Sequence, residues 1–415
     1  MTPTPAVSII IPVWNLWDMT CDCLHSLAQH TDHSNIEIIV VDNGSTDESA
    51  TALEPTGQAL FGPHFRRIRH EENRGFAKAC NAGAQAARAP RLLFLNNDTL
   101  LSPEWLPPLV DSLDTSPCLG MVGPLLLLPS GRVQHCGIAF APTLEVSHIY
   151  DLFPHQHPLI TKNRPLQAIT GAAFLLTQEL FFRCGQLHEG YINGFEDLDL
   201  CCLVRQQNLR LACVPRSIVY HLTSQTPGRS DHDSANARLL NQRQSGAFKP
   251  DLHLLGAEDG YIPRLSPSLE LYLTLPAQLE AALTSTFRQH FNEERCRVRL
   301  EAEPLWEHGY TLLARHLESR KAYADAVNVR STQVHFFPLA PYAVALARSA
   351  ARSGEHALAQ SASEATQSLL QSAANTEELQ RKAQKLQAWS QEMGDTDLEK
   401  IFANWLLAPV APTLA

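Results

Sequence analysis

Residues 92–99 read Leu92-Leu93-Phe94-Leu95-Asn96-Asn97-Asp98-Thr99, and this stretch decides the fold that we predict. Its four apolar residues are typical of a buried β-strand. Three polar residues follow at once and end in a carboxylate. Ligands of open α/β sheets bind beyond the carboxyl ends of the strands, so Asp98 is expected where a metal-bound phosphate would lie. The alternative is an Asx-type turn, because Asn and Asp are common turn residues.

Strands and helices alternate along the chain around this stretch. Such alternation predicts βαβ units and a mainly parallel sheet, which is the α/β class of fold. Polar residues follow three of the strands, at Asn15, Asp42 and Asp98. Because parallel strands end at one edge of a sheet, these residues are expected to outline a nucleotide site. Strands are predicted at residues 7–13, 36–41, 66–69, 92–95 and 166–169.

Several common sites are excluded by their missing motifs. No GxGxxG follows the first strand and no GxxxxGK[ST] occurs anywhere, so neither a Rossmann dehydrogenase nor a P-loop enzyme is expected. The ten cysteines include no CxxC pair with the spacing of a zinc site. We interpret them as free thiols.

Composition places the chain among globular proteins. Its 415 residues suffice for two or three domains, with 44% hydrophobic and 18% charged residues. The formal net charge of -10 argues against a general affinity for nucleic acid or an anionic membrane. We see no basic leader of a signal peptide, and no apolar run reaches the roughly 18 residues of a membrane span. We therefore expect a cytoplasmic protein without a transmembrane segment, at most peripheral at the inner face of the membrane.

The C-terminal part has a helical pattern from Leu269 onward. Two segments look internally related, because Tyr310 and Tyr342 begin similar runs 32 residues apart. That spacing is near the period of about 34 residues of tetratricopeptide repeats, although an unrelated helical bundle is an equal alternative. Helical repeats offer a concave face, so these helices are expected to bind a protein partner or a second copy of the chain.

Five motifs in series, in the order and spacing of a known family, carry a resemblance that covers about residues 6–230. They resemble the family 2 glycosyltransferases of GT-A fold, and among these the bacterial enzymes that build O-antigen and rhamnan. The motifs are VSIIIPVWN (7–15), VVDNGSTD (40–47), NRGFAKACNAG (73–83), LNNDT (95–99) and GFEDLDL (194–200), followed by Tyr220-His221.

The resemblance implies a GT-A domain over residues 1–250, a mainly parallel sheet flanked by helices. A connector with helical segments over residues 251–300 and an α-helical domain over residues 301–407 are expected after it. Processive relatives carry transmembrane helices and a QxxRW motif after the catalytic base. The only QxxR near that place, residues 207–210, is followed by Leu211 where the motif has tryptophan. A non-processive enzyme is therefore expected.

The resemblance also implies a divalent metal, Mn2+ or Mg2+. Asp98 corresponds to the last Asp of the family's DxD motif, whose first Asp is replaced here by Asn96. One carboxylate fewer leaves room for another ligand, and a histidine at the place of His221 contacts the metal or the diphosphate in related enzymes. The alternative is that His221 is an ordinary surface histidine, since the chain has 18.

The remaining site residues follow from the same resemblance. Asp42 would read the nucleobase or ribose, and five more residues are expected at the nucleotide: Pro12, Asn15, Arg74, Gly75 and Asn97. Asp197 is expected to be the general base of an inverting transfer, with Glu196 in reserve, because a helix N-terminus keeps a carboxylate ionised. The alternative is an ordinary acidic first turn of a helix.

The sequence thus predicts a metal-dependent, inverting glycosyltransferase that uses a UDP- or dTDP-sugar. Its acceptor would be a hydroxyl of a glycan precursor or of a protein. The alternative is a nucleotide-sugar-binding scaffold, built around the C-terminal helices, with weak or no transferase activity.

Overall fold

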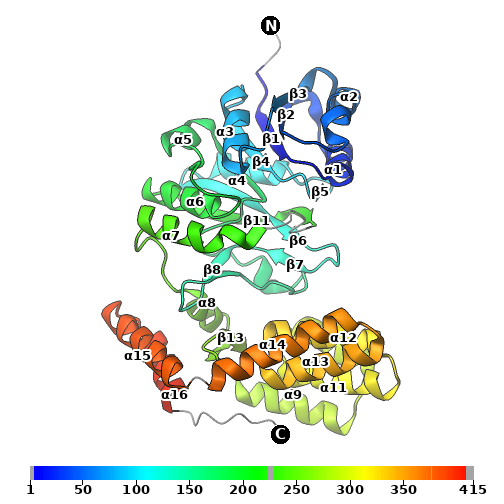
Figure 1. The fold of residues 1–415 in the computed structure, drawn as a ribbon, viewed down its shortest axis with the longest axis vertical. Coiled ribbons are helices and arrows are strands. Elements are labelled where there is room, and N and C mark those ends of the chain that lie inside the picture. Colours follow the sequence, from blue (N-terminus) through cyan, green and yellow to red (C-terminus); the bar gives the residue numbers. More distant parts are fainter. Residues whose placement is uncertain (1–3, 223–228, 375, 408–415) are drawn as a thin grey trace. The chain divides into compact units, whose positions relative to one another are not determined.

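The computed structural model describes residues 4–222, 229–374 and 376–407 (Figure 1). The chain divides into two compact units. The N-terminal unit comprises residues 1–139 and 148–249, and the C-terminal unit comprises residues 140–147 and 250–415.

The N-terminal unit is built on one large sheet. Its strands are β1 (Val7–Val13), β2 (Ile36–Asn43), β3 (Phe65–His70), β4 (Arg91–Leu95), β5 (Thr99–Leu101), β6 (Leu119–Leu127), β7 (Val133–His135), β10 (Ala173–Thr177) and β11 (Arg210–His221). Its helices are α1 (Trp17–His30), α2 (Ser49–Phe61), α3 (Phe76–Ala86), α4 (Pro107–Thr115), α5 (Gln178–Arg183), α6 (Glu196–Gln206) and α7 (Asp233–Arg243). Two short strands, β8 (Ile138–Phe140) and β9 (Val146–His148), span the boundaries of the units.

The strand order is β3-β2-β1-β4-β10-β6-β11-β5, and β7 pairs with β6. β1 to β4 run parallel, as do β6 and β11, so the mainly parallel sheet is confirmed. β10 is antiparallel to both β4 and β6. The carboxyl ends of β1, β2 and β4 therefore lie at one edge, where polar residues were predicted to gather.

The predicted strand over residues 166–169 is wrong. Leu166 and Ala168 form only isolated bridges, while the strand is β10, which begins at Ala173. β10 has hydrogen-bonding partners on both sides, in β4 and β6. Its Phe174 also stacks on Phe94 of β4, with ring centroids 4.7 Å apart.

Helices cover both faces of the sheet, which explains why the central strand β1 is buried along its whole length and β4 over its last four residues. On one face, Ile9 and Val40 pack with residues of α1, α2 and α4. On the other face, Ile39 and Val41 pack with Ala79 of α3. All four strand residues are fully buried or nearly so, and each contributes about 1.5–3 kcal/mol of hydrophobic stabilisation.

The C-terminal unit is mainly helical, as predicted. It contains α8 (Leu252–Glu258), α9 (Ala277–Gln289), α10 (Glu293–Ala302), α11 (Glu307–Ser319), α12 (Tyr323–Phe336), α13 (Ala340–Ser353), α14 (His356–Ala374), α15 (Thr376–Glu392) and α16 (Thr396–Leu407). An antiparallel hairpin that we did not predict, β12 (Ile262–Leu265) and β13 (Leu271–Thr274), lies between α8 and α9 in the chain.

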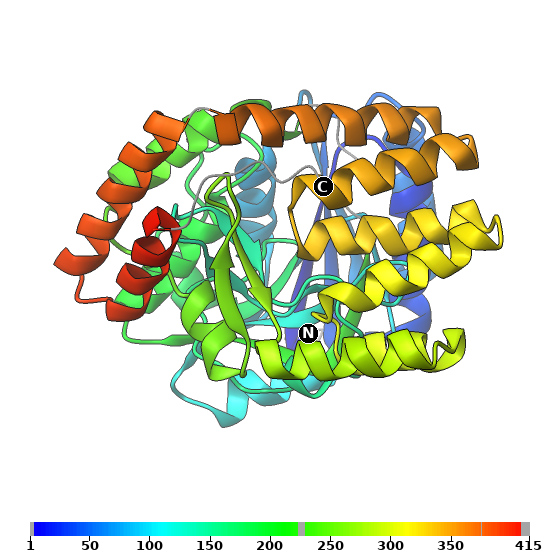
Figure 2. The same ribbon diagram turned by 90° about the horizontal axis from the view of Figure 1, so that it is seen from below.

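Helices α11 to α14 pack one against the next and form a row in Figure 2. α11 begins at residue 307 and α13 at residue 340, a spacing close to the period of about 34 residues of tetratricopeptide repeats. Membership of that repeat class stays a prediction. Over the ranges that the structure describes, no helix has the length and apolar character needed to cross a membrane.

Candidate active site

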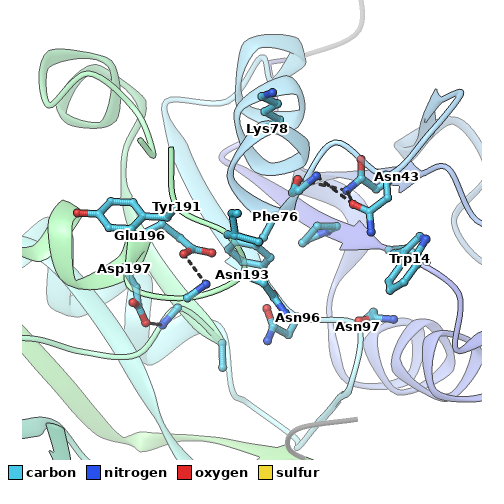
Figure 3. Close-up of a pocket in the computed structure, with 18 of the residues that line it drawn as sticks. Trp14, Asn43, Phe76, Lys78, Asn96, Asn97, Tyr191, Asn193, Glu196 and Asp197 are labelled. Carbon is cyan, nitrogen blue, oxygen red and sulfur yellow. Dashed lines mark hydrogen bonds between the residues drawn. The ribbon is translucent and has the colours of Figure 1, made fainter. Parts of the chain in front are cut away.

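A cavity of about 690 Å³ opens in the N-terminal unit at the edge where β1, β2 and β4 end. Figure 3 shows Glu196 and Asp197 on one wall, with Trp14 and Asn97 on the opposite wall. Eight predicted residues line it: Pro12, Arg74, Gly75, Asn97, Asp98, Glu196, Asp197 and His221. Asn15 and Asp42 are not among the lining residues.

The pairing of β5 with β11 brings Asp98 and His221 together. In this antiparallel pair His221 lies opposite Thr99, and the Leu222 N–H donates to the main-chain oxygen of Asp98 at 2.9 Å. His221 Nε2 is thereby placed 3.1 Å from Asp98 Oδ1. The His221 and Asp98 side chains are only 7% and 12% exposed. Two predicted metal ligands, far apart in the sequence, thus form one buried pair.

The donor atoms of this pair fit a divalent metal. His221 Nε2 and Asp98 Oδ1 lie at the distance of an ion pair, and both are atoms that can bind a divalent metal. Neighbouring ligands about 2.1 Å from an octahedral ion lie about 3.0 Å apart, close to the distance seen here. No group of three or more His, Cys, Asp or Glu side chains suited to a metal occurs in the described ranges. Phosphate and water oxygens would complete such a site.

Asp197 lies at the N-terminal end of α6, facing the cavity. Its Oδ2 accepts a hydrogen bond of 2.7 Å from the Gly171 N–H, and its Oδ1 accepts one of 2.9 Å from the Leu198 N–H. Two main-chain donors and the helix dipole favour the ionised carboxylate. A Cβ atom on Gly171 would lie 3.1 Å from Asp197 Cβ, so only glycine allows this approach without displacement. The arrangement suits a proton acceptor.

The other two acids of α6 have different surroundings. Glu196 lines the cavity but is only 5% exposed, and its Oε2 accepts a hydrogen bond of 2.8 Å from the Gly194 N–H. Asp199 is fully buried, where it forms an ion pair of 3.0 Å with Arg243 and accepts a hydrogen bond of 2.8 Å from Gln244. Asp199 therefore holds α7 against α6 and does not line the cavity.

The segment before α6 forms part of the cavity wall in an unusual conformation. Asn193 and Phe195 have positive φ angles of 52° and 73°, which L-residues rarely adopt. Asn236 of α7 holds the segment by two hydrogen bonds with the main chain of Ile192. Strained backbone of this kind is often found at functional sites.

At the end of β2, Asp42 is fully buried against protein groups. It pairs with Arg67 and Arg69, and the Ser45 N–H donates to its Oδ1 at 2.9 Å. Burial tends to raise the pKa of Asp42, but the hydrogen bonds from Arg67 and Ser45 outweigh this and hold it below its usual range. In this conformation no oxygen of Asp42 faces the cavity.

Asn15 is likewise bound within the protein, because its Oδ1 accepts a hydrogen bond of 2.8 Å from the Thr46 N–H. Asn97 lines the cavity and donates to Thr20 Oγ1 at 2.8 Å. Roles for Asn15, Asn97 and Asp42 at a nucleotide stay predictions.

Three lining residues were missed or left undecided by the sequence reading. Trp14 is 40% exposed and presents an aromatic ring to the cavity. Asn43, at the end of β2, donates to Asn73 at 2.8 Å and accepts from the Arg74 N–H at 3.0 Å, which fixes the loop before α3. Lys78 also lines the cavity. Trp14 had a signal, since it directly follows the apolar strand, residues 7–13, of the first motif.

Comparison with known proteins agrees with this geometry. The sequence model described as "Glycosyl transferase family 2" matches residues 8–127. A Sinorhizobium fredii protein named "Uncharacterized protein y4gI" is 31% identical over 249 residues, which are 58% of this chain and 27% of that protein. The O-antigen biosynthesis protein RfbC of Myxococcus xanthus is 29% identical over 242 residues, which are 57% of this chain and 18% of that protein. This chain thus spans less than a third of either relative.

Among solved structures, the mannosyltransferase PcManGT of Pyrobaculum calidifontis, in complex with GDP-Man and Mn2+, is 15% identical with a TM-score of 0.42. The match covers 89% of this chain and 88% of that one. The family match begins in β1 and ends in β6, so it includes the parallel strands and the loops that carry Trp14, Arg74 and Asp98. Residues 8–127 therefore belong to a glycosyltransferase domain of family 2, with the GT-A fold that the motifs predict.

Proposed function

We propose that the protein is a metal-dependent, inverting, non-processive glycosyltransferase that uses a UDP- or dTDP-sugar. One observation carries the proposal: a single cavity holds the Asp98–His221 pair and, from another element, the carboxylate of Asp197. The pair suits a metal-bound diphosphate, and the carboxylate suits the removal of a proton from an acceptor. A metal-assisted sugar transfer with inversion uses both.

In the proposed reaction the acceptor hydroxyl oxygen attacks the anomeric carbon of the donor sugar. The bond between that carbon and the diphosphate breaks, its electron pair leaves with the diphosphate, and the hydroxyl proton passes to Asp197. A single in-line displacement inverts the anomeric centre. When bound, a divalent ion supplies positive charge for the leaving diphosphate, and Asp98 and His221 would hold it. The Gly171 N–H orients Asp197 toward the acceptor.

The two walls of the cavity suit the two substrates. We propose that the exposed ring of Trp14 stacks on the nucleobase, with Arg74 beside it. The wall around Asp197 would receive the acceptor. The relative in Myxococcus xanthus is named for O-antigen biosynthesis, which favours a surface-glycan precursor as the acceptor over a protein. The C-terminal helices are proposed to contact a protein partner or a second copy of the chain.

A nucleotide-sugar-binding scaffold with weak or no activity is the alternative. It has no use for a carboxylate that main-chain donors hold in position at the cavity, as they hold Asp197. Turnover separates the two. We expect release of nucleotide from the matching donor sugar by the wild-type protein and little release by Asp197→Asn, whereas a scaffold would bind nucleotide without turnover.

The first test is a thermal-shift panel of UDP, dTDP, GDP and CMP, each with and without Mn2+. A ligand at 100 times its Kd stabilises the folded state by about 2.7 kcal/mol, which moves Tm by several degrees. We expect the largest, metal-dependent shift with UDP or dTDP, and no metal dependence in Asp98→Asn, which keeps the side-chain shape. No shift with any nucleotide in folded protein would contradict the proposal.

A further inference from the structure

Strand β7 contacts His221 on the side of its ring that is turned away from Asp98. Both β7 and β11 pair with the end of β6, where Leu126 and Leu127 are the partner residues. Gln134, in the middle of β7, is only 8% exposed. Its Oε1 lies 2.8 Å from Nδ1 of His221, the ring nitrogen that points away from Asp98. A buried amide thus contacts the far side of a proposed metal ligand.

Which atom donates in this contact decides whether His221 Nε2, the ring nitrogen near Asp98, can bind a metal. A neutral imidazole carries one proton, and a nitrogen that donates to a carbonyl oxygen must be the one that holds it. With Gln134 Oε1 as the acceptor, the proton lies on Nδ1. Nε2 then carries a lone pair on the side of the ring where Asp98 Oδ1 lies, 3.1 Å away. This is the tautomer that a metal requires.

The amide nitrogen of Gln134 points to a second possible state. It is buried and has no hydrogen-bond partner in the part of the chain that the structure describes. If the amide turned over, this nitrogen would donate to Nδ1 and the ring proton would move to Nε2. Nε2 would then face Asp98 as a donor, and the ring could not bind a metal. Unlike an aliphatic side chain, glutamine can support either tautomer of His221.

We propose that Gln134 is a positioning residue of the metal site. Its carbonyl oxygen holds His221 in the Nδ1–H tautomer, so that Nε2 and Asp98 Oδ1 face one ion together. This inference rests on the proposed function, because it assumes the metal. Removing the hydrogen-bond partner of a metal-bound histidine typically weakens metal affinity 10–100-fold.

The test measures binding of Mn2+ alone to the full chain, by electron paramagnetic resonance of the free ion. Gln134→Met keeps the length of the side chain without an acceptor, and Gln134→Glu keeps the acceptor without a donor. We expect the Kd for Mn2+ to rise 10–100-fold in Gln134→Met. In Gln134→Glu it should stay at the wild-type value or fall. Gln134→Met removes the unpartnered donor but also the acceptor of the His221 Nδ1–H, so its Tm should fall by no more than a few degrees, which shows that the variant is folded.

Gln333→Met is the matched control. Gln333 is also fully buried and hydrogen-bonded, but it lies on α12 of the C-terminal unit, so its loss should leave the Kd for Mn2+ unchanged. Asp98→Asn marks loss of the site itself. Wild-type affinity in Gln134→Met, or equal losses in Gln134→Met and Gln134→Glu, would overturn the inference and leave the metal site intact. No binding by the wild type, with or without UDP or dTDP, would overturn the metal site too.

Discussion

The contact between Gly171 and Asp197 gives a prediction that can be worked out from distances. In Gly171→Ala the new Cβ would lie 3.1 Å from Asp197 Cβ and 3.2 Å from Asp197 Oδ2. Ordinary contacts begin near 3.4 Å, so the carboxylate must move by a few tenths of an ångström. Gly171 has no positive φ angle, so alanine fits its main chain. The strain therefore falls on the Asp197 side chain.

The displacement weakens the hydrogen bond of 2.7 Å from the Gly171 N–H. Hydrogen bonds to charged groups contribute about 1.5–3 kcal/mol, and losing about half of that changes a rate about 4- to 13-fold. Poor alignment of the base with the acceptor adds to the loss. We expect kcat for nucleotide release from the donor sugar to fall about 10–100-fold. Nucleotide binding, measured by thermal shift, should not change, because the opposite wall of the cavity is untouched.

A double-mutant cycle shows whether Gly171 acts through Asp197. Asp197→Asn alone should lower kcat by about 10²–10⁴-fold, the range of a general base. Adding Gly171→Ala to Asp197→Asn should cost little more, since no base remains to be misplaced. If the losses of kcat in the two single variants multiply in the double variant, the reasoning is refuted. So would a Gly171→Ala protein with full activity, or one that has lost activity and nucleotide binding together through misfolding.

Three further predictions concern stability and nucleotide binding. Asp199→Ala should lower the free energy of unfolding by about 2–4 kcal/mol in denaturant titration, because it leaves Arg243 and Gln244 without their buried partner. Because the pKa of Asp42 is lowered in the folded protein, its ionised carboxylate stabilises the fold at pH values above the ordinary pKa of 3.8. This contribution is lost as the pH falls through the lower pKa of the folded state. Asp42→Asn should thus be less stable than the wild type at pH 7, with the difference in chemical-denaturation midpoints shrinking below pH 4, and a constant difference would contradict this account. Trp14→Ala should weaken binding of the preferred nucleotide about 10–100-fold in a titration, with unchanged Tm without ligand, because its ring is 40% exposed.

The fold was largely predictable because its strands and motifs are local patterns. The parallel strands β1 to β4 follow from apolar runs that end in polar residues. The helical C-terminal part follows from its periodicity. Leu166 misled the interpretation, because an apolar run does not tell which neighbouring strand it can pair with. The strand is β10 instead, because it has hydrogen-bonding partners on both sides, in β4 and β6.

Which residues line the site could be predicted from the sequence better than the contacts that each residue makes. Asp98, His221 and Asp197 line one cavity, as the motifs imply. Asp42 and Asn15 are bound to other protein groups, because Arg67, Arg69 and the loop after β2 supply donors that a strand-end pattern does not show. Gln134 could not have been found from sequence, since its relevance comes only from a distance to His221.

The acidic first turn of α6 shows where sequence reasoning ends and geometry begins. Each residue turns a helix by about 100°, so adjacent carboxylates face different surroundings although their letters look equivalent. Asp199 forms a buried ion pair with Arg243, and Glu196 is buried and accepts a hydrogen bond from the Gly194 N–H. Among the three acids, only Asp197 combines partial exposure, a place on the cavity wall and two main-chain donors, which favour an ionised carboxylate. A base must be ionised, correctly oriented and accessible at once, and this is why we propose Asp197 as the proton acceptor.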